Sequence, residues 1–297
     1  MISLQKALSS PRLMKALTGL MPAEFTDLLP TFERSLQKHR AGKGLRAGLG
    51  RPHTLGTIEL KLFFALFYAK CYPTFDMASF IFNADRHRCH DWTKELLAAL
   101  ELALDKKIVL PERKLRTPEE FFARFPGVKD IWIDGTERPV RRVKDKQKQQ
   151  RQYSGKKKRH TVKNIVVSDK KKRILYLTKT VAGKEHDYQE FKDKKLAAGI
   201  PPTVRAWLDT GFQGIQKDFP QLTVRMPKRA SRGHPLTAAQ KTKNQQISRK
   251  RILAEHAIGG MKRFRSLTDV FRNHTDAFAD RLALLGAGLW NFHLQQS

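Results

Sequence analysis

Two aspartates follow short apolar runs in this chain, and each is followed closely by glycine. Asp134 lies in the stretch Ile131-Trp132-Ile133-Asp134-Gly135, and Asp209 lies in Val204-Arg205-Ala206-Trp207-Leu208-Asp209-Thr210-Gly211. Short runs of β-favouring apolar residues bounded by turn residues predict buried strands. We therefore expect each aspartate where a strand stops, the edge at which open α/β sheets bind their ligands. Two carboxylates there offer oxygen ligands to a hard divalent cation.

A third carboxylate is expected from a long helix near the C-terminus. The pattern predicts a helix from about Thr237 to Arg265, and Glu255 lies within it. Arg251 precedes Glu255 by four residues and Lys262 follows it by seven, so the three side chains share one helix face. Glu255 could complete a metal site with the two aspartates, or it could form a surface ion pair with Arg251. The sequence leaves both interpretations open.

The overall charge indicates a polyanionic partner. The 297 residues include 58 Lys and Arg against 28 Asp and Glu, which gives a formal charge of +30 and a pI near 10.4. Such a balance is typical of nucleic-acid-binding proteins. A generally cationic protein without such a partner is the alternative, but the cations are clustered, which favours nucleic acid. The hydrophobic fraction of 40% is sufficient for a substantial core.

Much of the excess charge lies directly after the first aspartate. Residues 138–173 contain sixteen Lys and Arg and only two Asp, and the run Lys156, Lys157, Lys158 and Arg159 is its densest part. Cations at this density neutralise phosphates and make DNA affinity depend on salt. A solvated basic tail is the alternative for part of the segment. Its position between two predicted strands favours phosphate binding.

A helical block precedes the aspartates. Residues 53–104 predict three helices, the first capped by Thr57, and the third begins near Asp85 with Arg86 and Arg88 in its opening turns. A short helix, a turn and a helix with a basic beginning resemble a helix-turn-helix, in which the second helix presents its first residues to the major groove. An ordinary three-helix bundle with solvated charges fits the block equally well.

Glycine-rich and proline-rich segments divide the sequence into three predicted parts. Residues 1–50 start as helix and end in the glycine-rich run 41–50, which predicts a linker. Residues 51–110 hold the helical block. Residues 111–297 begin with a proline-rich connection and a short helix that Thr117 caps and Pro118 starts. They would form an α/β domain with a mixed five-stranded sheet and flanking helices.

The α/β region should follow the order β-β-β-α-β-β-α-α. Besides the two aspartate strands, the sequence predicts a hairpin with strands at 163–168 and 173–178, a helix at 187–198 and a fifth strand at 221–227. Two long helices are predicted at 237–265 and 276–294. Val181 to Lys184 is expected to be a loop, and Tyr153 to Gly155 a turn. Asp187 is interpreted mainly as the N-cap of its helix, although His186 and Asp187 could also lie near the acids.

Cysteine and hydropathy patterns exclude several classes of protein. The two cysteines, Cys71 and Cys89, cannot support a disulfide scaffold, and the spacing of Cys89 with His87 and His90 matches no standard zinc motif. The sequence shows no apolar run that would span a bilayer and no signal peptide. We expect a cytoplasmic protein with no membrane partner.

Four motifs together resemble the DDE transposases of bacterial insertion sequences. They occur in that family's order, and with the helical block the resemblance covers about residues 50 to 295. The motifs are Asp134-Gly135-Thr136-Glu137-Arg138-Pro139, Tyr153-Ser154-Gly155-Lys156-Lys157-Lys158-Arg159-His160-Thr161, Leu208-Asp209-Thr210-Gly211-Phe212-Gln213-Gly214 and Glu255-His256-Ala257-Ile258-Gly259.

The resemblance implies a ribonuclease-H-like catalytic domain with the acidic triad Asp134, Asp209 and Glu255, preceded by a helix-turn-helix. It implies two Mg²⁺ or Mn²⁺ ions held by these acids, with Arg251 and Lys262 near the phosphate. Members of this family often carry a tyrosine where this chain has Ser248. The resemblance further implies double-stranded DNA as partner, both element ends and target, a homodimer or higher oligomer on DNA, and a nucleoid-associated location.

The expected reaction is cleavage of phosphodiester bonds at insertion-sequence ends and transfer of the 3′ ends to target DNA. Two divalent ions can activate a water and stabilise the leaving oxygen in such a reaction. Two alternatives remain: a non-catalytic DNA-binding protein derived from a transposase, and another metal-dependent nuclease on the same fold. The presence of all three acids argues against the first, because sequence drift would readily lose one of them.

Overall fold

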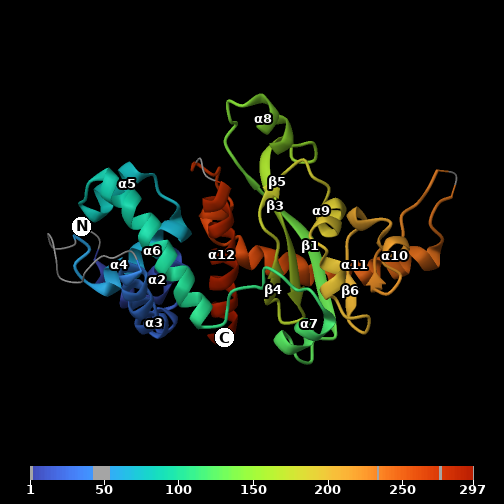
Figure 1. Cartoon of the computed structure of the whole chain (residues 1–297), viewed down its shortest axis with the longest axis horizontal. Helices are drawn as coiled ribbons and strands as arrows, with labels where there is room; N and C mark the ends of the chain where they lie inside the picture. The colour runs from blue at the N-terminus through green and yellow to red at the C-terminus, as the bar shows by residue number, and fades with distance from the viewer. Residues whose placement is uncertain (1–2, 43–53, 233, 274–275, 297) are drawn as a thin grey trace. The chain divides into compact units, whose positions relative to one another are not determined.

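The structure is a computed structural model that describes residues 3–42, 54–232, 234–273 and 276–296 (Figure 1). The chain forms two compact units. The first contains Met1–Leu110, Met261–Asp269 and Arg281–Ser297, and the second contains Pro111–Gly260 and Val270–Asp280. The first unit therefore combines N-terminal helices with two C-terminal segments, rather than following consecutive stretches of the sequence. The glycine-rich linker expected over 41–50 lies mostly outside the described residues.

The first unit is helical. Its elements are α1 (Leu4–Leu8), α2 (Pro11–Thr18), α3 (Pro22–Ala41), α4 (Ile58–Cys71), α5 (Phe75–Phe82), α6 (Arg86–Lys106), the 3₁₀ helix η3 (Arg265–Leu267) and the larger part of α12 (Asp276–Gln296). Thr57 caps α4 as expected, because its hydroxyl accepts a hydrogen bond from the Leu60 N–H at 3.3 Å. No helix in the described part of the chain is long and apolar enough to cross a membrane.

The three helices predicted for residues 53–104 are confirmed as α4, α5 and α6. Asn83 ends α5 in the left-handed conformation, with φ of 48°. The Phe64 ring packs edge-on against Phe82 at 5.0 Å and against Trp92 at 5.5 Å between ring centroids, which joins the three helices. The assignment of these helices to a helix-turn-helix stays a prediction.

The second unit is built on a mixed sheet with the strand order β2-β3-β1-β6-β7, and β4 and β5 pair with further parts of β3. Its strands are β1 (Asp130–Pro139), β2 (Tyr153–Ser154), β3 (Arg159–Asp169), β4 (Ile174–Leu177), β5 (Val181–Ala182), β6 (Arg205–Trp207) and β7 (Thr223–Arg225). Strand β1 pairs with β6 in parallel and with β3 in antiparallel orientation, and β6 pairs with β7 in parallel. The predicted mixed α/β architecture is confirmed, including the β3–β4 hairpin.

The described sheet has seven strands rather than the five expected. The two additional strands, β2 and β5, replace the turn expected at 153–155 and the loop expected at 181–184. Each has only two residues, and both pair with the long strand β3. Two residues are too few to show a period-2 pattern in the sequence, so neither strand could be recognised there.

Helices cover the sheet or extend from its ends. They are α7 (Pro118–Arg124), α8 (Lys146–Gln152), α9 (Asp187–Asp193), α10 (Ile215–Asp218) and α11 (Ala238–Met261), with the 3₁₀ helices η1 (Leu196–Gly199) and η2 (Thr210–Phe212). Figure 1 shows α8 and α7 at opposite ends of the long strands. Thr117 caps α7 as expected. Reciprocal hydrogen bonds between Thr237 and Gln240 hold the beginning of α11.

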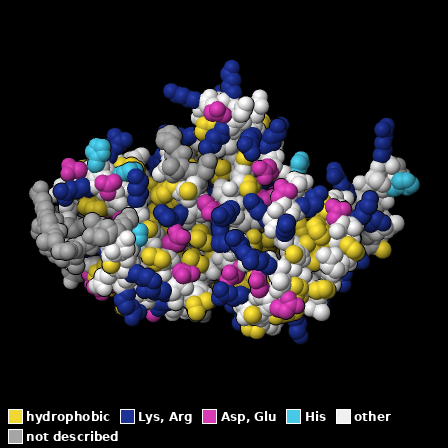
Figure 2. Space-filling view, in the orientation of Figure 1, with side chains coloured by type: hydrophobic (Ala, Val, Ile, Leu, Met, Phe, Trp, Pro, Cys, Tyr) yellow, Lys and Arg dark blue, Asp and Glu magenta, His cyan; other side chains and the backbone are white. Residues whose placement is uncertain are grey.

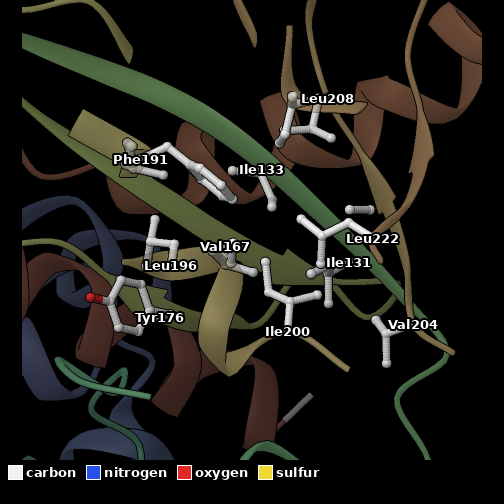
Figure 3. Packing of buried hydrophobic residues seen from close by; sticks show 14 of the residues in the cluster. Ile131, Ile133, Val167, Tyr176, Phe191, Leu196, Ile200, Val204, Leu208 and Leu222 are labelled. Atoms are coloured by element: carbon white, nitrogen blue, oxygen red, sulfur yellow. The ribbon is translucent and has the colours of Figure 1, made fainter. Parts of the chain in front are cut away.

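Alternate residues of β1 pack against two different layers. Ile131 and Ile133 belong to a large buried cluster with side chains from β3, β4, α9 and β6 and with Leu208 and Leu222 beside them (Figure 3). Trp132 instead joins Trp207 and residues of α11 in a second cluster on the other face. Because side chains alternate along a strand, Asp134 lies on the same face as Trp132, the face that α11 covers.

Candidate active site

Asp134 and Asp209 occupy equivalent places on neighbouring parallel strands. Trp132 of β1 and Trp207 of β6 are register partners, and each is followed two residues later by one of the aspartates. Strand β1 does not stop at Asp134 as expected but continues to Pro139, because its antiparallel pairing with β3 extends that far. The parallel pairing does stop before Asp134. The two acids therefore lie just past the point where two parallel strands separate, which is the expected ligand-binding edge.

The two carboxylates are held in the same way by the backbone. The Gly135 N–H donates to Asp134 Oδ1 at 2.8 Å, and the Thr210 N–H donates to Asp209 Oδ1 at 2.6 Å. The Thr210 hydroxyl also donates to Asp209 Oδ1, at 3.3 Å. Hydrogen bonds of this kind fix the orientation of a carboxylate.

Helix α11 brings a cation to these acids. Arg251 Nη1 lies 3.3 Å from Asp209 Oδ1, and 17% of the Arg251 side-chain surface is exposed. The Trp132 indole N–H donates to the Lys250 carbonyl oxygen at 2.9 Å, and the Lys250 ammonium lies 5.0 Å from the centre of the Trp207 ring. The tryptophan pair thus attaches α11 to the sheet next to the residue that reaches Asp209.

The pKa of Asp134 depends on the other charged residues of this group. Burial raises the pKa of its carboxyl, and the Gly135 hydrogen bond and the positive charge of Arg251 lower it in part. The negative charges of Asp209 and Asp187 raise the same pKa further. Two carboxylates beside one guanidinium form a group with a net negative charge, which an added cation would stabilise.

The structure does not bring Glu255 into a metal-binding group with the two aspartates. Glu255 is exposed on α11, one turn after Arg251. Within the described ranges, no three His, Cys, Asp or Glu side chains are close enough together to hold a metal ion. Lys262 follows the last residue of α11 and belongs to the other unit. Of the residues expected at the site, Asp134, Asp209 and Arg251 are therefore together.

A fourth acid, Asp187, lies close to Asp134, although the sequence favoured its interpretation as a helix N-cap over a place near the acids. His186, not Asp187, is the N-cap of α9, and Asp187 is its first helical residue. A Cβ atom added to Gly135 would lie 2.6 Å from Asp187 Oδ1, so the carboxylate rests against the glycine. Lys163 of β3 donates to Asp187 Oδ1 at 2.9 Å and to the Glu185 carbonyl oxygen at 2.5 Å. The Lys163 side chain is only 5% exposed.

The basic run forms the tip of a hairpin. Lys156, Lys157 and Lys158 make the turn between β2 and β3, and Arg159 is the first residue of β3; all four are exposed. Lys158 has a positive φ of 53°, and the Lys157 N–H donates to the Ser154 hydroxyl at 3.2 Å. Figure 2 shows Lys and Arg side chains projecting from the region around α8. The segment is thus a folded projection with its cations at the surface.

The two arginines expected to contact DNA from the helical block lie in the first turn of α6. Arg86 Nε is 3.6 Å from Asp76 Oδ1, with 66% of the arginine side chain exposed. Arg88 Nη1 donates to the Thr54 hydroxyl at 3.0 Å, and its Nε lies 3.8 Å from Asp85 Oδ2. Exposed ion pairs of this length are weak, so both guanidinium groups can exchange these partners for phosphate.

Comparison with known proteins identifies relatives of this chain. Residues 133–291 match the family model described as DDE superfamily endonuclease, a span that begins next to Asp134 and includes Asp209 and Glu255. The chain is 30% identical over 194 residues to a protein of Microchaete diplosiphon described as a probable transposase for insertion sequence element IS702. That similarity covers 64% of this chain and 67% of the relative. No solved structure gives a significant match.

Proposed function

The chain belongs to the DDE transposases of insertion sequences, and we propose that it cleaves phosphodiester bonds at the ends of such an element and joins the 3′ ends to target DNA. The observation that carries this proposal is the placement of Asp134 and Asp209 side by side past the separation of β1 and β6, with Arg251 beside them. The family supports the reaction class, and the geometry of the two aspartates supports this edge of the sheet as its site.

The donor set fits a divalent cation. Asp134 and Asp209 supply hard carboxylate oxygens at a place where the negative charges of Asp134, Asp209 and Asp187 act together with the one positive charge of Arg251. We assign Asp134, Asp209 and Glu255 to hold two Mg²⁺ or Mn²⁺ ions; Glu255, which the structure does not place beside the two aspartates, would join them from α11, the helix that carries Arg251. Bound there, such ions would activate water and stabilise the leaving oxygen.

The protein's own groups would bind and orient the DNA. Arg251 would contact the phosphate at the cleavage point, because its guanidinium is already fixed beside Asp209. The exposed cations of residues 156–159 would hold the backbone of the duplex, and Arg86 and Arg88 of α6 would contact DNA in the manner of a helix-turn-helix. Lys262 is assigned to phosphate as well. A ribonuclease-H-like fold for the second unit is part of the same proposal.

The proposal extends to the assembly and its place in the cell. We expect a homodimer or higher oligomer on double-stranded DNA, in which two copies hold the two element ends, in the bacterial cytoplasm at the nucleoid. Cross-linking of the protein with and without DNA carrying an element end measures this directly. If cross-linking detects only monomers both with and without DNA, the proposed assembly is contradicted.

The decisive experiment compares cleavage by the wild-type protein with cleavage by three separate variants, Asp134→Asn, Asp209→Asn and Glu255→Gln. Labelled DNA carrying an element end is incubated with Mg²⁺, and strand nicking and joining are resolved on a gel. Each variant should lose cleavage while retaining DNA binding, because the changes remove negative charge rather than phosphate contacts. Glu101→Gln, a change in the helical unit at a residue paired with Arg281, serves as the matched control.

The outcomes separate the possible functions. A variant that cuts like the wild type refutes the assignment of that acid. Wild-type protein that binds DNA and never cuts it would support a non-catalytic DNA-binding protein derived from a transposase. Nicking without joining of 3′ ends to a target would indicate another metal-dependent nuclease.

A further inference from the structure

The ion pair between Lys163 and Asp187 lies on the opposite face of the sheet from Asp134. Gly135 pairs with Ile165 across β1 and β3, and Ile165 belongs to the large core cluster on the α9 face. Lys163 lies two residues before Ile165 on β3, so it shares that face. Asp134 lies on the other face, the one that α11 covers. Asp187 of α9 and Asp134 of β1 thus lie close to each other on opposite faces of strand β1.

The contact between them passes through a glycine. Asp187 Oδ1, Cγ and Oδ2 would lie 2.6, 2.7 and 2.8 Å from a Cβ at position 135, so a side chain there would require the Asp187 carboxylate to shift. The carboxylate therefore occupies the space that a side chain of β1 would fill. Because the Gly135 N–H is the donor to Asp134 Oδ1, the backbone against which Asp187 rests also orients the Asp134 carboxylate.

The position of Asp187 is itself fixed. The buried Lys163 ammonium donates to Asp187 and to the Glu185 carbonyl oxygen, so it holds both the first residue of α9 and the chain that leads into it. Below this pair, α9 is anchored by Phe191 and Glu190, which are both fully buried. Asp187 is thus held by a buried donor and a packed helix and has little freedom to turn away from Gly135.

We propose that Asp187 and Lys163 form a positioning pair that holds the Gly135 peptide, and through it the Asp134 carboxylate, in the orientation required for cleavage. The role of Asp134 in cleavage rests on the proposed function, whereas the effect on the Gly135 peptide does not. Asp187 acts from the far side of the strand, so it need not touch DNA or any cation. It is a positioning residue for Asp134 and not a member of the acidic triad.

A spectroscopic test follows from the sequence. The chain contains a single Asp-Gly dipeptide, Asp134-Gly135. Full-length protein labelled with ¹³C at Asp carbonyls and ¹⁵N at Gly therefore gives one carbonyl–amide correlation, which reports on this peptide alone. Its amide proton shift measures the hydrogen bond that Gly135 donates to Asp134, without DNA, metal or catalysis.

Two paired changes separate positioning from simple loss of structure. Lys163→Met with Asp187→Ala removes the pair, whereas Lys163→Gln with Asp187→Asn retains a donor and an acceptor without charge. Asp193→Ala is the control, because it removes an acid of the same helix that contacts Gln189. All proteins are compared by the Gly135 signal, by affinity for duplex DNA and by cleavage rate.

We expect the Gly135 amide proton to move upfield in the Met/Ala protein and to stay near its wild-type position in the Gln/Asn and Asp193→Ala proteins. Cleavage by the Met/Ala protein should fall by about tenfold to a hundredfold with DNA affinity unchanged, since small displacements of a catalytic group have effects of this size. If the Met/Ala protein fails to fold, the single change Asp187→Ala takes its place.

Two results would overturn the proposal. One is an unchanged Gly135 signal and cleavage rate when the pair is removed. The other is a Gln/Asn protein in which the Gly135 signal shifts as much as in the Met/Ala protein. This would show that the hydrogen bond between residues 163 and 187 does not position the Gly135 peptide. The proposed function fails separately, if Asp134→Asn cleaves DNA like the wild type, and the Gly135 signal still decides the positioning role in that case.

Discussion

Trp132 and Trp207 stack in parallel on the face of the sheet that α11 covers, with ring centroids 6.3 Å apart and an interplanar angle of 10°. They are register partners on β1 and β6, and each precedes a candidate catalytic aspartate by two residues. The Trp207 indole N–H donates to Asp130 Oδ1 at 2.8 Å, whereas that of Trp132 donates to the Lys250 carbonyl oxygen. The hydrogen bond of Trp207 thus lies within the sheet, whereas that of Trp132 joins the sheet to α11.

This difference predicts unequal effects of two similar substitutions. Trp132→Phe and Trp207→Phe each remove one hydrogen bond, so each should lower the free energy of unfolding by about 1 kcal/mol, measured by urea denaturation. Only Trp132→Phe releases the backbone next to Arg251, and only this variant should cut DNA markedly more slowly. Equal cleavage rates for the two variants would show that the hydrogen bond from Trp132 to Lys250 does not position Arg251.

A second prediction concerns the pH dependence of cleavage. Arg251 lowers the pKa of Asp134, which burial and the charges of Asp209 and Asp187 raise. In Arg251→Gln that pKa rises, so a higher pH is needed to ionise Asp134 and the acidic limb of the rate profile moves upward. The maximal rate should also fall by about a hundredfold, as when other preorganised charged groups are removed from an active site. Arg251→Lys retains the charge and should leave the acidic limb in place; an unmoved limb in Arg251→Gln would contradict the prediction.

The two aspartates could be predicted from the sequence because each follows a short apolar run that forms a strand. These runs end close to where the pairing between β1 and β6 ends. The sequence did not show that β1 continues past Asp134. Residues 135–139 are Gly, Thr, Glu, Arg and Pro and show no apolar strand pattern, and they are ordered by pairing with residues 161–165 of β3. Pairing between distant segments overrides local preference in this case.

Contacts between segments also explain what the sequence could not give at the site. The spacing of Arg251 and Glu255 fixes their common helix face, but the orientation of that helix on the sheet depends on Trp132 and Lys250. Asp187 looked like a helix cap, and its contact with Gly135 depends on the approach of α9 to β1. The only sequence signal for that contact was the glycine itself, a residue required where another group approaches the backbone closely.

A third prediction concerns the stability of the second unit. Glu190 is fully buried, its Oε1 accepts a hydrogen bond from Thr178 at 2.5 Å, and its Oε2 has no hydrogen-bond partner among the described residues. Burial is the main cause that raises the pKa of Glu190 to about 7, from a reference of 4.5. Because the folded-state pKa is the higher one, stability from this group is complete below about pH 4.5 and is lost as the pH rises through about 7.

Glu190→Gln removes this dependence and keeps the acceptor for Thr178. The variant should therefore be more stable than the wild type at pH 8, by up to about 3 kcal/mol, and the difference should shrink toward pH 5. Urea denaturation of both proteins across this range measures it. A difference that is constant with pH would show that Glu190 does not titrate between pH 5 and 8.

The fourth prediction uses two lysine-rich turns at opposite ends of β3. Lys156 and Lys157 lie in the turn before the strand, and Lys170 and Lys171 lie in the turn after it; all four are exposed. If the β2–β3 hairpin holds the duplex, Lys156→Gln with Lys157→Gln should reduce the slope of log affinity against log salt by about 1.8, or about 0.9 for each phosphate that the variant no longer neutralises. Lys170→Gln with Lys171→Gln removes the same charge and should leave the slope nearly unchanged. Fluorescence anisotropy of a labelled duplex at several salt concentrations gives both slopes. Equal reductions in the two variants would mean that net charge, and not the position of the hairpin, determines DNA affinity.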